Sequence, residues 1–288
     1  MTCGGIRQFY ILHFAFCILK TGVSMSIQSI TLGKLEYLAA EGISAPHCFT
    51  TRYGGVSEGY LSGMNIGTHR GDTPENVLKN YQILADAIGF DPDKLVLTHQ
   101  THTDTVLQVG KAEYGAGLTK PELTECDALI TNEPGTALVI FSADCTPILL
   151  HDPVTGAVGA AHAGWRGTAK NIGGKTVLAM CQAYGCKPEN IRAAIGPNIG
   201  VCCFETDADV PEAMLATYGD PAKPYILPKG RKFYVNLKAL NALSLKLAGV
   251  TQIEVSADCT VCQKDRFWSA RVTGNVRGSQ GAIIVCNR

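Results

Sequence analysis

Four residues of this chain have the side chains and the spacing of a transition-metal site. They are His99, His102, Cys145 and His162, and the whole chain has only seven histidines. Cys145 and His162 stand in turn segments, Ser142-Ala-Asp-Cys-Thr-Pro and Ala161-His-Ala-Gly-Trp-Arg. Two imidazoles and one thiolate leave the fourth position of a zinc ion open, which is the arrangement of a catalytic site. Copper or nickel accepts similar ligands.

The neighbours of these residues strengthen the metal hypothesis. Taken singly, a histidine near apolar strands ordinarily packs in the core, and so does a cysteine. Here Asp144 precedes the thiol, and Trp165 and Arg166 follow the histidine. We expect Asp144 either to move a proton or to orient a ligand histidine.

The same residues fit two other kinds of protein. In a cysteine hydrolase or transferase, Cys145 would be the nucleophile and His162 its base. In a metal-stabilised binding module, the metal would serve no reaction. The pair Cys259 and Cys262 has the spacing of half a zinc knuckle, but no second Cys-x-x-Cys follows. We therefore expect these two thiols only to pack near a turn.

Four arginines stand in predicted turns and indicate an anionic substrate, since arginine binds phosphate in a bidentate manner. They are Arg52, Arg166, Arg271 and Arg277. Arg52 and Arg166 have glycine-rich neighbours that would admit a ligand, so we favour these two.

The elements that position these residues alternate between strands and helices. Apolar patterns predict strands at residues 27–32, 95–98, 127–131, 137–143, 147–151, 158–163, 191–197, 253–256 and 281–286. Helical spacing predicts helices from about 74 to 88, 169 to 184, 206 to 218 and 236 to 248. No repeat, linker or break in composition divides the chain. We predict a mixed α/β (α+β) fold of layered mixed β-sheets flanked by helices, with a single catalytic domain over residues 26–288.

Composition narrows the class of partner. Lys plus Arg and Asp plus Glu are equal at 25 each, and neither sign forms a block, which argues against binding nucleic acid. A small-molecule substrate is the better expectation. Twelve cysteines without regular spacing favour reduced thiols, and hence a cytoplasmic protein.

The first 25 residues form an extension that differs from the rest. The run from Phe9 to Leu19 resembles a signal peptide, but it is too short for a membrane-spanning helix. We favour Met25 as the true start, which leaves a protein without a membrane segment.

Taken together, six motifs in one order resemble the multicopper-oxidase-like "laccase domain" family, now regarded as purine nucleoside phosphorylases. The resemblance runs from about residue 27 to the C-terminus. The motifs are Phe49-Thr-Thr-Arg-Tyr-Gly-Gly-Val-Ser, Met64-Asn-Ile-Gly, Gln100-Thr-His, Ser142-Ala-Asp-Cys-Thr-Pro, Ala161-His-Ala-Gly-Trp-Arg-Gly and Ile195-Gly-Pro-Asn-Ile-Gly-Val-Cys-Cys-Phe-Glu.

The resemblance implies zinc bound by His102, Cys145 and His162, and thereby selects His102 over His99. It also implies phosphorolysis of adenosine, inosine and 5'-methylthioadenosine, with phosphate as co-substrate and an adenosine deaminase side activity. The chain departs from the family pattern twice: Thr103 replaces a glycine, and Arg271-Val272 replaces a pair of arginines. The second change affects the expected phosphate contact at Arg271.

We expect Arg52 or Arg166 to hold phosphate, and Asn65 and Gln100 to hydrogen-bond ribose or base. Cys145, Asp144 and Arg166 are the expected catalytic residues. The metal could bind phosphate, or activate a water for attack on adenine. The older alternative, a copper-dependent phenol oxidase, needs about ten histidines for its several copper centres, and seven are too few.

Overall fold

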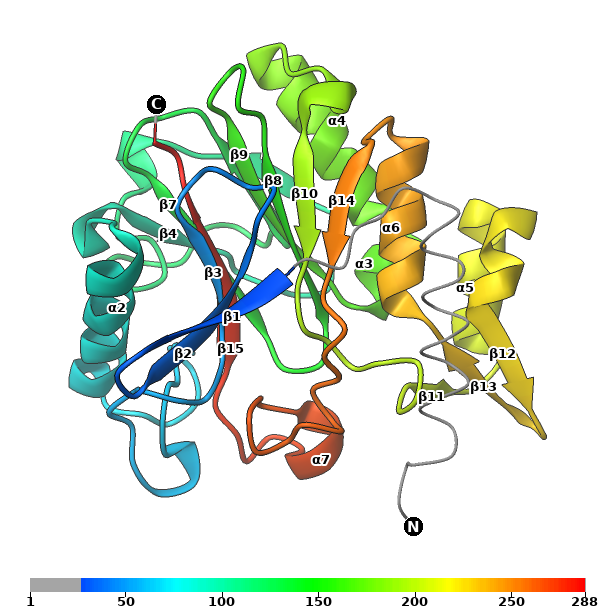
Figure 1. The fold of residues 1–288 in the computed structure, drawn as a ribbon, viewed down its shortest axis with the longest axis horizontal. Helices are drawn as coiled ribbons and strands as arrows, with labels where there is room; N and C mark the ends of the chain where they lie inside the picture. The colour runs from blue at the N-terminus through cyan, green and yellow to red at the C-terminus, as the bar shows by residue number, and fades with distance from the viewer. Residues whose placement is uncertain (1–26, 288) are drawn as a thin grey trace.

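A computed structural model describes residues 27–287 of the chain. Two six-stranded sheets lie face to face, and helices cover both outer faces (Figure 1). This arrangement confirms the predicted layered fold of mixed β-sheets flanked by helices. The predicted N-terminal extension, residues 1–25, lies outside the described residues.

The first sheet contains both termini of the described chain and has one parallel pair, β4 with β7. Its order is β1 (Ile27–Leu32), β2 (Leu35–Ala40), β3 (His47–Thr50), β15 (Gln280–Val285), β7 (Ala137–Ser142) and β4 (Leu95–Leu97). Helix α2 (Pro74–Ile88) packs on its outer face. It begins where Thr73 accepts a hydrogen bond from the Asn76 amide and ends at left-handed Gly89, as the sequence predicts.

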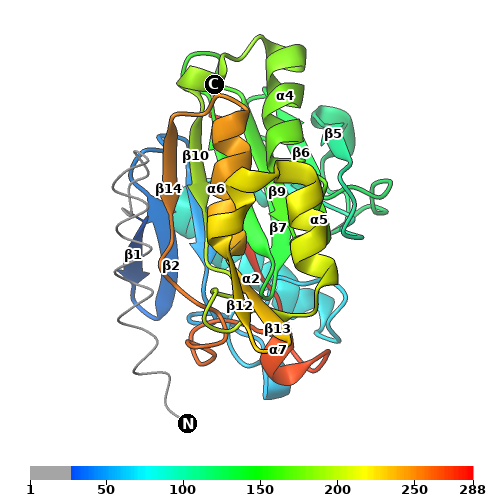
Figure 2. The same cartoon turned by 90° about the vertical axis from the view of Figure 1, so that its right-hand side faces the viewer.

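The second sheet carries the turns of the candidate site. Its order is β14 (Gln252–Val255), β10 (Arg192–Ile195), β8 (Thr146–His151), β9 (Val158–Ala163), β6 (Ala128–Thr131) and β5 (Val106–Gln108). Helices α4 (Ile172–Tyr184) and α6 (Leu237–Leu247) cover its outer face (Figure 2). A short helix, α3 (Trp165–Ala169), follows β9 directly.

The remaining elements lie beside these layers. A small sheet of order β11 (Glu205–Thr206), β13 (Lys232–Val235) and β12 (Ile226–Lys229) packs with α5 (Asp209–Tyr218). Helix α7 spans Ala270–Thr273. Five 3-10 helices span Gly59–Leu61, Pro92–Lys94, Lys111–Glu113, Pro188–Asn190 and Asp220–Tyr225.

The apolar strands face one another across the middle of the molecule. Phe49 and Ile140 of the first sheet pack with Leu149 and Ala160 of the second, all nearly inaccessible to solvent. Strands buried on both faces read as continuous apolar runs, which is why they are visible in the sequence. Among residues 27–287, no helix has both the length and the apolar character to cross a membrane.

Two predicted helices begin later than expected, and some short elements were not predicted. The helix predicted at 169–184 begins at Ile172, because Asn171, with a left-handed φ of 61°, separates it from the short helix α3. Helix α5 begins at Asp209, three residues later than predicted. The short strand β5 and the β12–β13 hairpin carry patterns too brief to predict.

Candidate metal centre and substrate pocket

The turn that carries Cys145 crosses from one sheet to the other. Strand β7 belongs to the first sheet and β8 to the second, and residues 143–145 join them. Asp144 has a φ of 88°, a conformation that costs a non-glycine residue energy and is typical of functional sites. Cys145 therefore stands at the edge of the inter-sheet core.

The carboxylate of Asp144 holds this turn in place. It accepts hydrogen bonds from the Thr260 hydroxyl at 2.6 Å, the Ser269 hydroxyl at 3.0 Å and the Arg271 amide at 2.7 Å. Its backbone carbonyl accepts a further bond from the Ile199 amide. These donors tie the turn to two loops that follow β10 and β14.

Three predicted ligands converge beside this turn. The ligand atoms of His102, Cys145 and His162 all lie within 4.8 Å of one another. Cys145 Sγ lies 3.7 Å from His102 Nε2, and the two imidazole rings are 5.0 Å apart. His162 is buried at the end of β9, whereas His102 is exposed. The cluster can hold a metal ion with one side open to solvent, as a catalytic zinc site requires.

His99 belongs to a different environment. Its Nδ1 lies 3.1 Å from the Leu123 carbonyl and its Nε2 3.7 Å from Glu122. The backbone at His102 explains why the two histidines lie in different environments. His102 has a left-handed φ of 62°, which turns its side chain toward Cys145 and away from His99.

Asp127, which sequence reasoning did not select, orients the ligands. Its fully buried carboxylate lies 2.7 Å from His162 Nδ1 and also accepts bonds from the amides of Thr101, His102 and Thr103. Because Nδ1 faces this carboxylate, Nε2 is available for a metal. An acid directly before an apolar strand was the signal that could have identified it.

The charges of the cluster are strongly coupled. Burial disfavours the Cys145 thiolate, but His162 and His102 outweigh burial and lower its pKa to about 6. Burial likewise disfavours the His162 cation, but Cys145 and Asp127 raise the pKa of His162 to about 10. Burial would raise the pKa of Asp127, yet His162 and the backbone amides lower it. A thiolate at neutral pH is the form that binds a metal.

Gly164 gives the cluster its room. A Cβ at this position would lie 2.7 Å from His102 Cδ2 and 3.2 Å from Cys145 Sγ, both too close. The backbone of Gly164 therefore forms a wall of the ligand cluster that only glycine allows. This wall, the donor set and the supporting Asp127 together fit a transition-metal ion.

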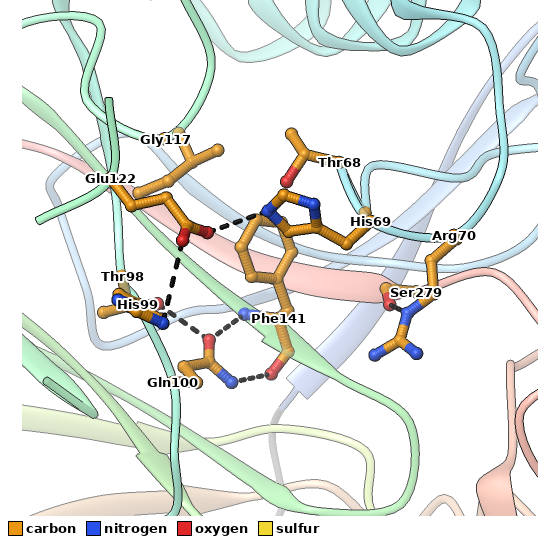
Figure 3. Close-up of a pocket in the computed structure, with 12 residues that line it drawn as sticks. Thr68, His69, Arg70, Thr98, His99, Gln100, Gly117, Glu122, Phe141 and Ser279 are labelled. Atoms are coloured by element: carbon orange, nitrogen blue, oxygen red, sulfur yellow. Dashed lines mark hydrogen bonds and ion pairs between the residues drawn. The ribbon is translucent and has the colours of Figure 1, made fainter. Parts of the chain in front are cut away.

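A polar pocket of about 430 Å³ opens on the loop that leads to His102 (Figure 3). Its lining includes Arg70, Thr98, His99, Gln100 and Glu122. Gln100 donates to the Phe141 carbonyl at 2.9 Å and accepts from the Phe141 amide, which fixes its amide at the wall of the pocket. The size is that of a small-molecule site.

Arg70 lines the pocket, and Arg277 lies within electrostatic reach of Arg70, Asp144 and Cys145. Burial and the charge of Arg70 lower the pKa of Arg277 to about 10, while Asp144 and Cys145 act in the opposite direction. The Nε of Arg277 is buried and has no hydrogen-bond partner within residues 27–287. Arg70 donates to the Ser279 hydroxyl at 3.1 Å. Arg277 also donates through Nη1 to the Gly278 carbonyl, so its Nε, unpartnered among the described residues, is the group that an anion could still engage.

The other predicted substrate residues lie outside this pocket. Arg52 stacks on Trp268 at 3.8 Å, and exposed Arg166 stacks on Trp165 at 4.3 Å. Arg271 donates to the carbonyls of Cys203 and Glu205.

Asn65 is fully buried beneath the glycine-rich loop. Its amide donates to Asp72 and accepts from the backbone of Gly67 and Ser279. These bonds fix the shape of the loop that carries Arg70.

The fold and the cluster define a class: a layered α/β protein with an open His-Cys-His centre beside a polar pocket. Over residues 46–287 the chain matches the family described as multi-copper polyphenol oxidoreductase laccase, and it belongs to this family. The family expected from the six motifs is thus confirmed.

Relatives within this family carry another name. A protein of Bacteroides thetaiotaomicron named purine nucleoside phosphorylase is 37% identical over 85% of this chain and 94% of its own length. One of Deinococcus radiodurans with the same name is 38% identical over 88% and 94%. Among solved structures, the Bacillus licheniformis hypothetical protein YfiH is 32% identical, with a TM-score of 0.85 over 91% of this chain and 99% of its own.

Proposed function

We propose that this chain is a zinc-dependent purine nucleoside phosphorylase acting on adenosine, inosine and 5'-methylthioadenosine, with an adenosine deaminase side activity. The names of its relatives support nucleoside chemistry. The structural observation that carries the proposal is the pair Arg70 and Arg277: Arg70 lines the pocket, and Arg277 lies within electrostatic reach of Arg70 and of Cys145 in the ligand cluster.

Phosphate is the anion that this arrangement fits. Two guanidiniums present forked N–H donors, and phosphate accepts such bonds in pairs. We therefore assign the phosphate site to Arg70 and Arg277. Arg166 remains a proposed catalytic residue, and Arg52 and Arg271 remain proposed substrate contacts, although the guanidiniums of all three stack on aromatic rings or bind backbone carbonyls outside the pocket.

The nucleoside would occupy the pocket. Gln100 uses one amide hydrogen on Phe141 and keeps the other for a ribose hydroxyl or base. His99 and Glu122 offer an imidazole and a carboxylate to the same ligand. Asn65 supports Arg70 instead, since its bonds to Asp72, Gly67 and Ser279 fix the loop that carries this arginine.

In phosphorolysis the bond from C1' of the ribose to the purine nitrogen breaks, and a phosphate oxygen bonds to C1'. The purine leaves with the electron pair and takes up a proton, and the products are free base and ribose 1-phosphate. Binding phosphate and nucleoside side by side, with the phosphate oxygen aligned to attack C1' opposite the purine, would accelerate the reaction by proximity and orientation. A bound Zn²⁺ would supply Lewis-acid chemistry at the same place.

His102, Cys145 and His162 would hold the zinc ion. Asp127 orients His162, and Asp144 positions Cys145 through its turn, since three donors already occupy the Asp144 carboxylate. Asp144 thus acts on the reaction through the ligand beside it.

The test is to mix zinc-loaded protein with inosine or adenosine, with and without phosphate. Equal amounts of free base and ribose 1-phosphate, formed only with phosphate, are expected. Cys145→Ala is expected to lose turnover and the zinc ion of the His-Cys-His centre, whereas Cys181→Ala, a change at a free cysteine on α4, keeps both. Turnover by metal-free Cys145→Ala protein would contradict the proposal.

One observation favours a second candidate, a cysteine hydrolase or transferase. Cys145 lies beside His162, and His162 in turn lies beside Asp127. This is the spatial arrangement of a thiol nucleophile, its base and the acid that orients the base. Alkylation separates the two functions. A coordinated thiolate is protected by stoichiometric zinc, whereas a nucleophile is modified equally fast with or without the ion.

A further inference from the structure

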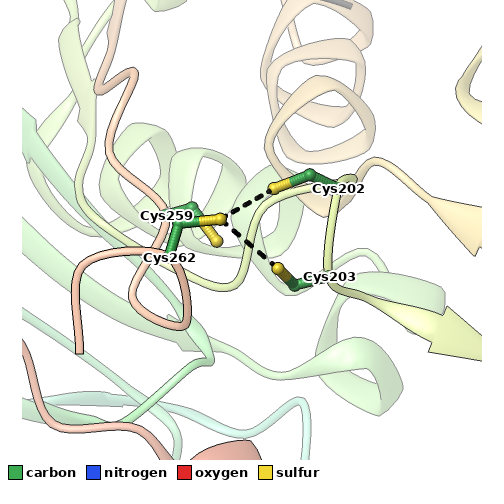
Figure 4. Close-up of side chains that lie close together, drawn as sticks. All are labelled: Cys202, Cys203, Cys259 and Cys262. Atoms are coloured by element: carbon green, nitrogen blue, oxygen red, sulfur yellow. Dashed lines mark hydrogen bonds between the residues drawn. The ribbon is translucent and has the colours of Figure 1, made fainter. Parts of the chain in front are cut away.

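A second group of thiols lies outside the site described above. Cys202 and Cys203 stand in the loop after β10, and Cys259 and Cys262 in the loop after β14. The four sulfur atoms lie within 4.8 Å of one another (Figure 4). Sequence reasoning sought a second Cys-x-x-Cys pair, but the partner of Cys259-Thr-Val-Cys262 is an adjacent pair of cysteines.

We propose that these four cysteines bind a structural zinc ion as a tetrathiolate, a second metal site distinct from the His-Cys-His centre. The number and type of ligands match a closed, four-coordinate zinc site. All four thiols are free, and each side chain faces the common centre from one of the two loops (Figure 4).

The separations of the sulfur atoms fit a shared ion. Cys262 Sγ lies 3.6 Å from Cys202 Sγ and 3.5 Å from Cys203 Sγ. Four sulfurs placed at ~2.3 Å from a zinc ion in a tetrahedron are ~3.8 Å apart. The thiols thus stand close to the positions that a zinc ion would give them.

The backbone around the thiols is arranged to support thiolates. The Gly200 amide donates to Cys259 Sγ at 3.2 Å. A Cβ on Gly200 would lie 3.1 Å from Cys202 Sγ and 3.1 Å from Cys259 Cβ, so a larger residue would press on the cluster. Amide donors to thiolate sulfur are a common feature of the surroundings of a metal.

A buried cation compensates part of the charge. Zinc binding releases the thiol protons to solvent and leaves a centre with a net charge of about −2, from four thiolates and one divalent ion. Lys238 is 5% exposed and donates to the Asp258 carbonyl, and the charges of Asp258, Cys259 and Cys202 all favour its cation. A lysine is rarely so buried without anionic partners, and the tetrathiolate would join Asp258 in supplying them.

The proposed ion would join two loops that support the first site. Thr260, between Cys259 and Cys262, donates to the Asp144 carboxylate, and Arg271 donates to the Cys203 carbonyl. A zinc ion joining these loops would fix the Asp144 turn and thereby Cys145. The proposal concerns binding alone and does not depend on the reaction that the protein catalyses.

The experiment counts zinc in the full chain, purified with zinc present under reducing conditions. Wild-type protein is expected to hold two zinc ions per chain, and His102→Ala one. Cys262→Ser is also expected to hold one, with a lower Tm, while the matched variant Cys181→Ser keeps two.

Cobalt identifies the ligands. His102→Ala loaded with Co²⁺ is expected to show about four times the sulfur-to-cobalt charge-transfer absorption of Cys262→Ser, because four thiolates replace one. If Cys262→Ser fails to fold, the zinc count and the cobalt spectrum of His102→Ala still decide. A His102→Ala protein without zinc, or a disulfide between the two pairs in the reduced wild type, would overturn the proposal.

Discussion

Asp127→Asn is the substitution whose effect follows most directly from the geometry of the metal centre. One carboxylate oxygen accepts from the His102 amide and faces His162 Nδ1, and the other accepts from the amides of Thr101 and Thr103. An asparagine offers one oxygen and one NH₂ group. Whichever way its amide turns, the NH₂ group faces two donors, so two hydrogen bonds are lost.

The magnitude can be estimated from these bonds. A hydrogen bond to a charged group contributes ~1.5–3 kcal/mol, so two lost bonds would destabilise the protein by roughly 3 kcal/mol or more. Loss of the acid that orients a ligand histidine typically weakens metal binding by about 10- to 100-fold. We expect both effects, since Asp127 holds His162 and the His102 peptide at once.

The assay is zinc competition with a chelator of known affinity, together with denaturant unfolding. Asp152→Asn is the matched control: it removes another fully buried acid that accepts hydrogen bonds from backbone amides, those of Val154 and Thr155, at the end of β8 opposite to Cys145. It is expected to lose stability but to keep zinc affinity close to that of the wild type. Equal zinc affinity in Asp127→Asn and wild type would refute the assignment.

Three further perturbations have defined outcomes. Gly164→Ala should lower the zinc content without unfolding the protein. The new methyl group would lie only 2.7 Å from His102 Cδ2 and would therefore push the imidazole ring aside. Atomic absorption measures the zinc content. Arg70→Gln should raise the phosphate KM about tenfold or more through the loss of a charge-assisted bond, as steady-state phosphorolysis would show. Burial raises the pKa of Asp72, but four hydrogen bonds to its carboxylate outweigh burial, so the pKa is lowered in the folded protein. The carboxylate therefore stabilises the fold above the unfolded pKa of ~3.9, and this stabilisation is lost as pH falls through the folded pKa. Asp72→Asn should therefore be less stable than wild type at pH 7 and lose less stability on acidification, by denaturant unfolding across pH.

Matched variants accompany these three. A Cβ at Gly167 would meet its neighbours at ordinary distances of 3.4 Å or more, so Gly167→Ala should keep its zinc. Arg231→Gln, in the exposed β12–β13 turn, should leave the phosphate KM unchanged. Asp93→Asn changes an exposed carboxylate and should follow the wild-type acid profile. Equal effects in test and control variants would count against each argument.

The layers of the fold could be predicted because their strands are buried on both sides. The runs Ala137–Phe141 and Ala282–Val285 are apolar throughout, and α2 carries a clear cap and a terminal glycine. The short helix α3 could not be predicted, because its five residues, Trp-Arg-Gly-Thr-Ala, carry no helical repeat of apolar side chains. Asn171 between α3 and α4 accepts a hydrogen bond from Ser244 of α6, a contact that only the fold creates.

The candidate site divides in the same way. Cys145 and His162 stand in motifs that are local in sequence, so the sequence singled them out as candidates, whereas His102 was chosen over His99 only by the family resemblance. Asp127 acts on His162 across 35 residues, and Arg70 meets Arg277 only through the fold. Contacts between residues so far apart in the chain depend on the order of the strands in the sheets, and the short sequence motifs do not reveal this order.

The central claim is phosphorolysis at a zinc centre held by His102, Cys145 and His162. The most direct measurement follows inosine by ³¹P NMR with zinc-loaded wild type and with Cys145→Ala. We predict a ribose 1-phosphate signal that grows in step with free hypoxanthine in the wild type and is absent from the variant. Release of hypoxanthine without ribose 1-phosphate, or the same signal from zinc-free Cys145→Ala, would contradict the account.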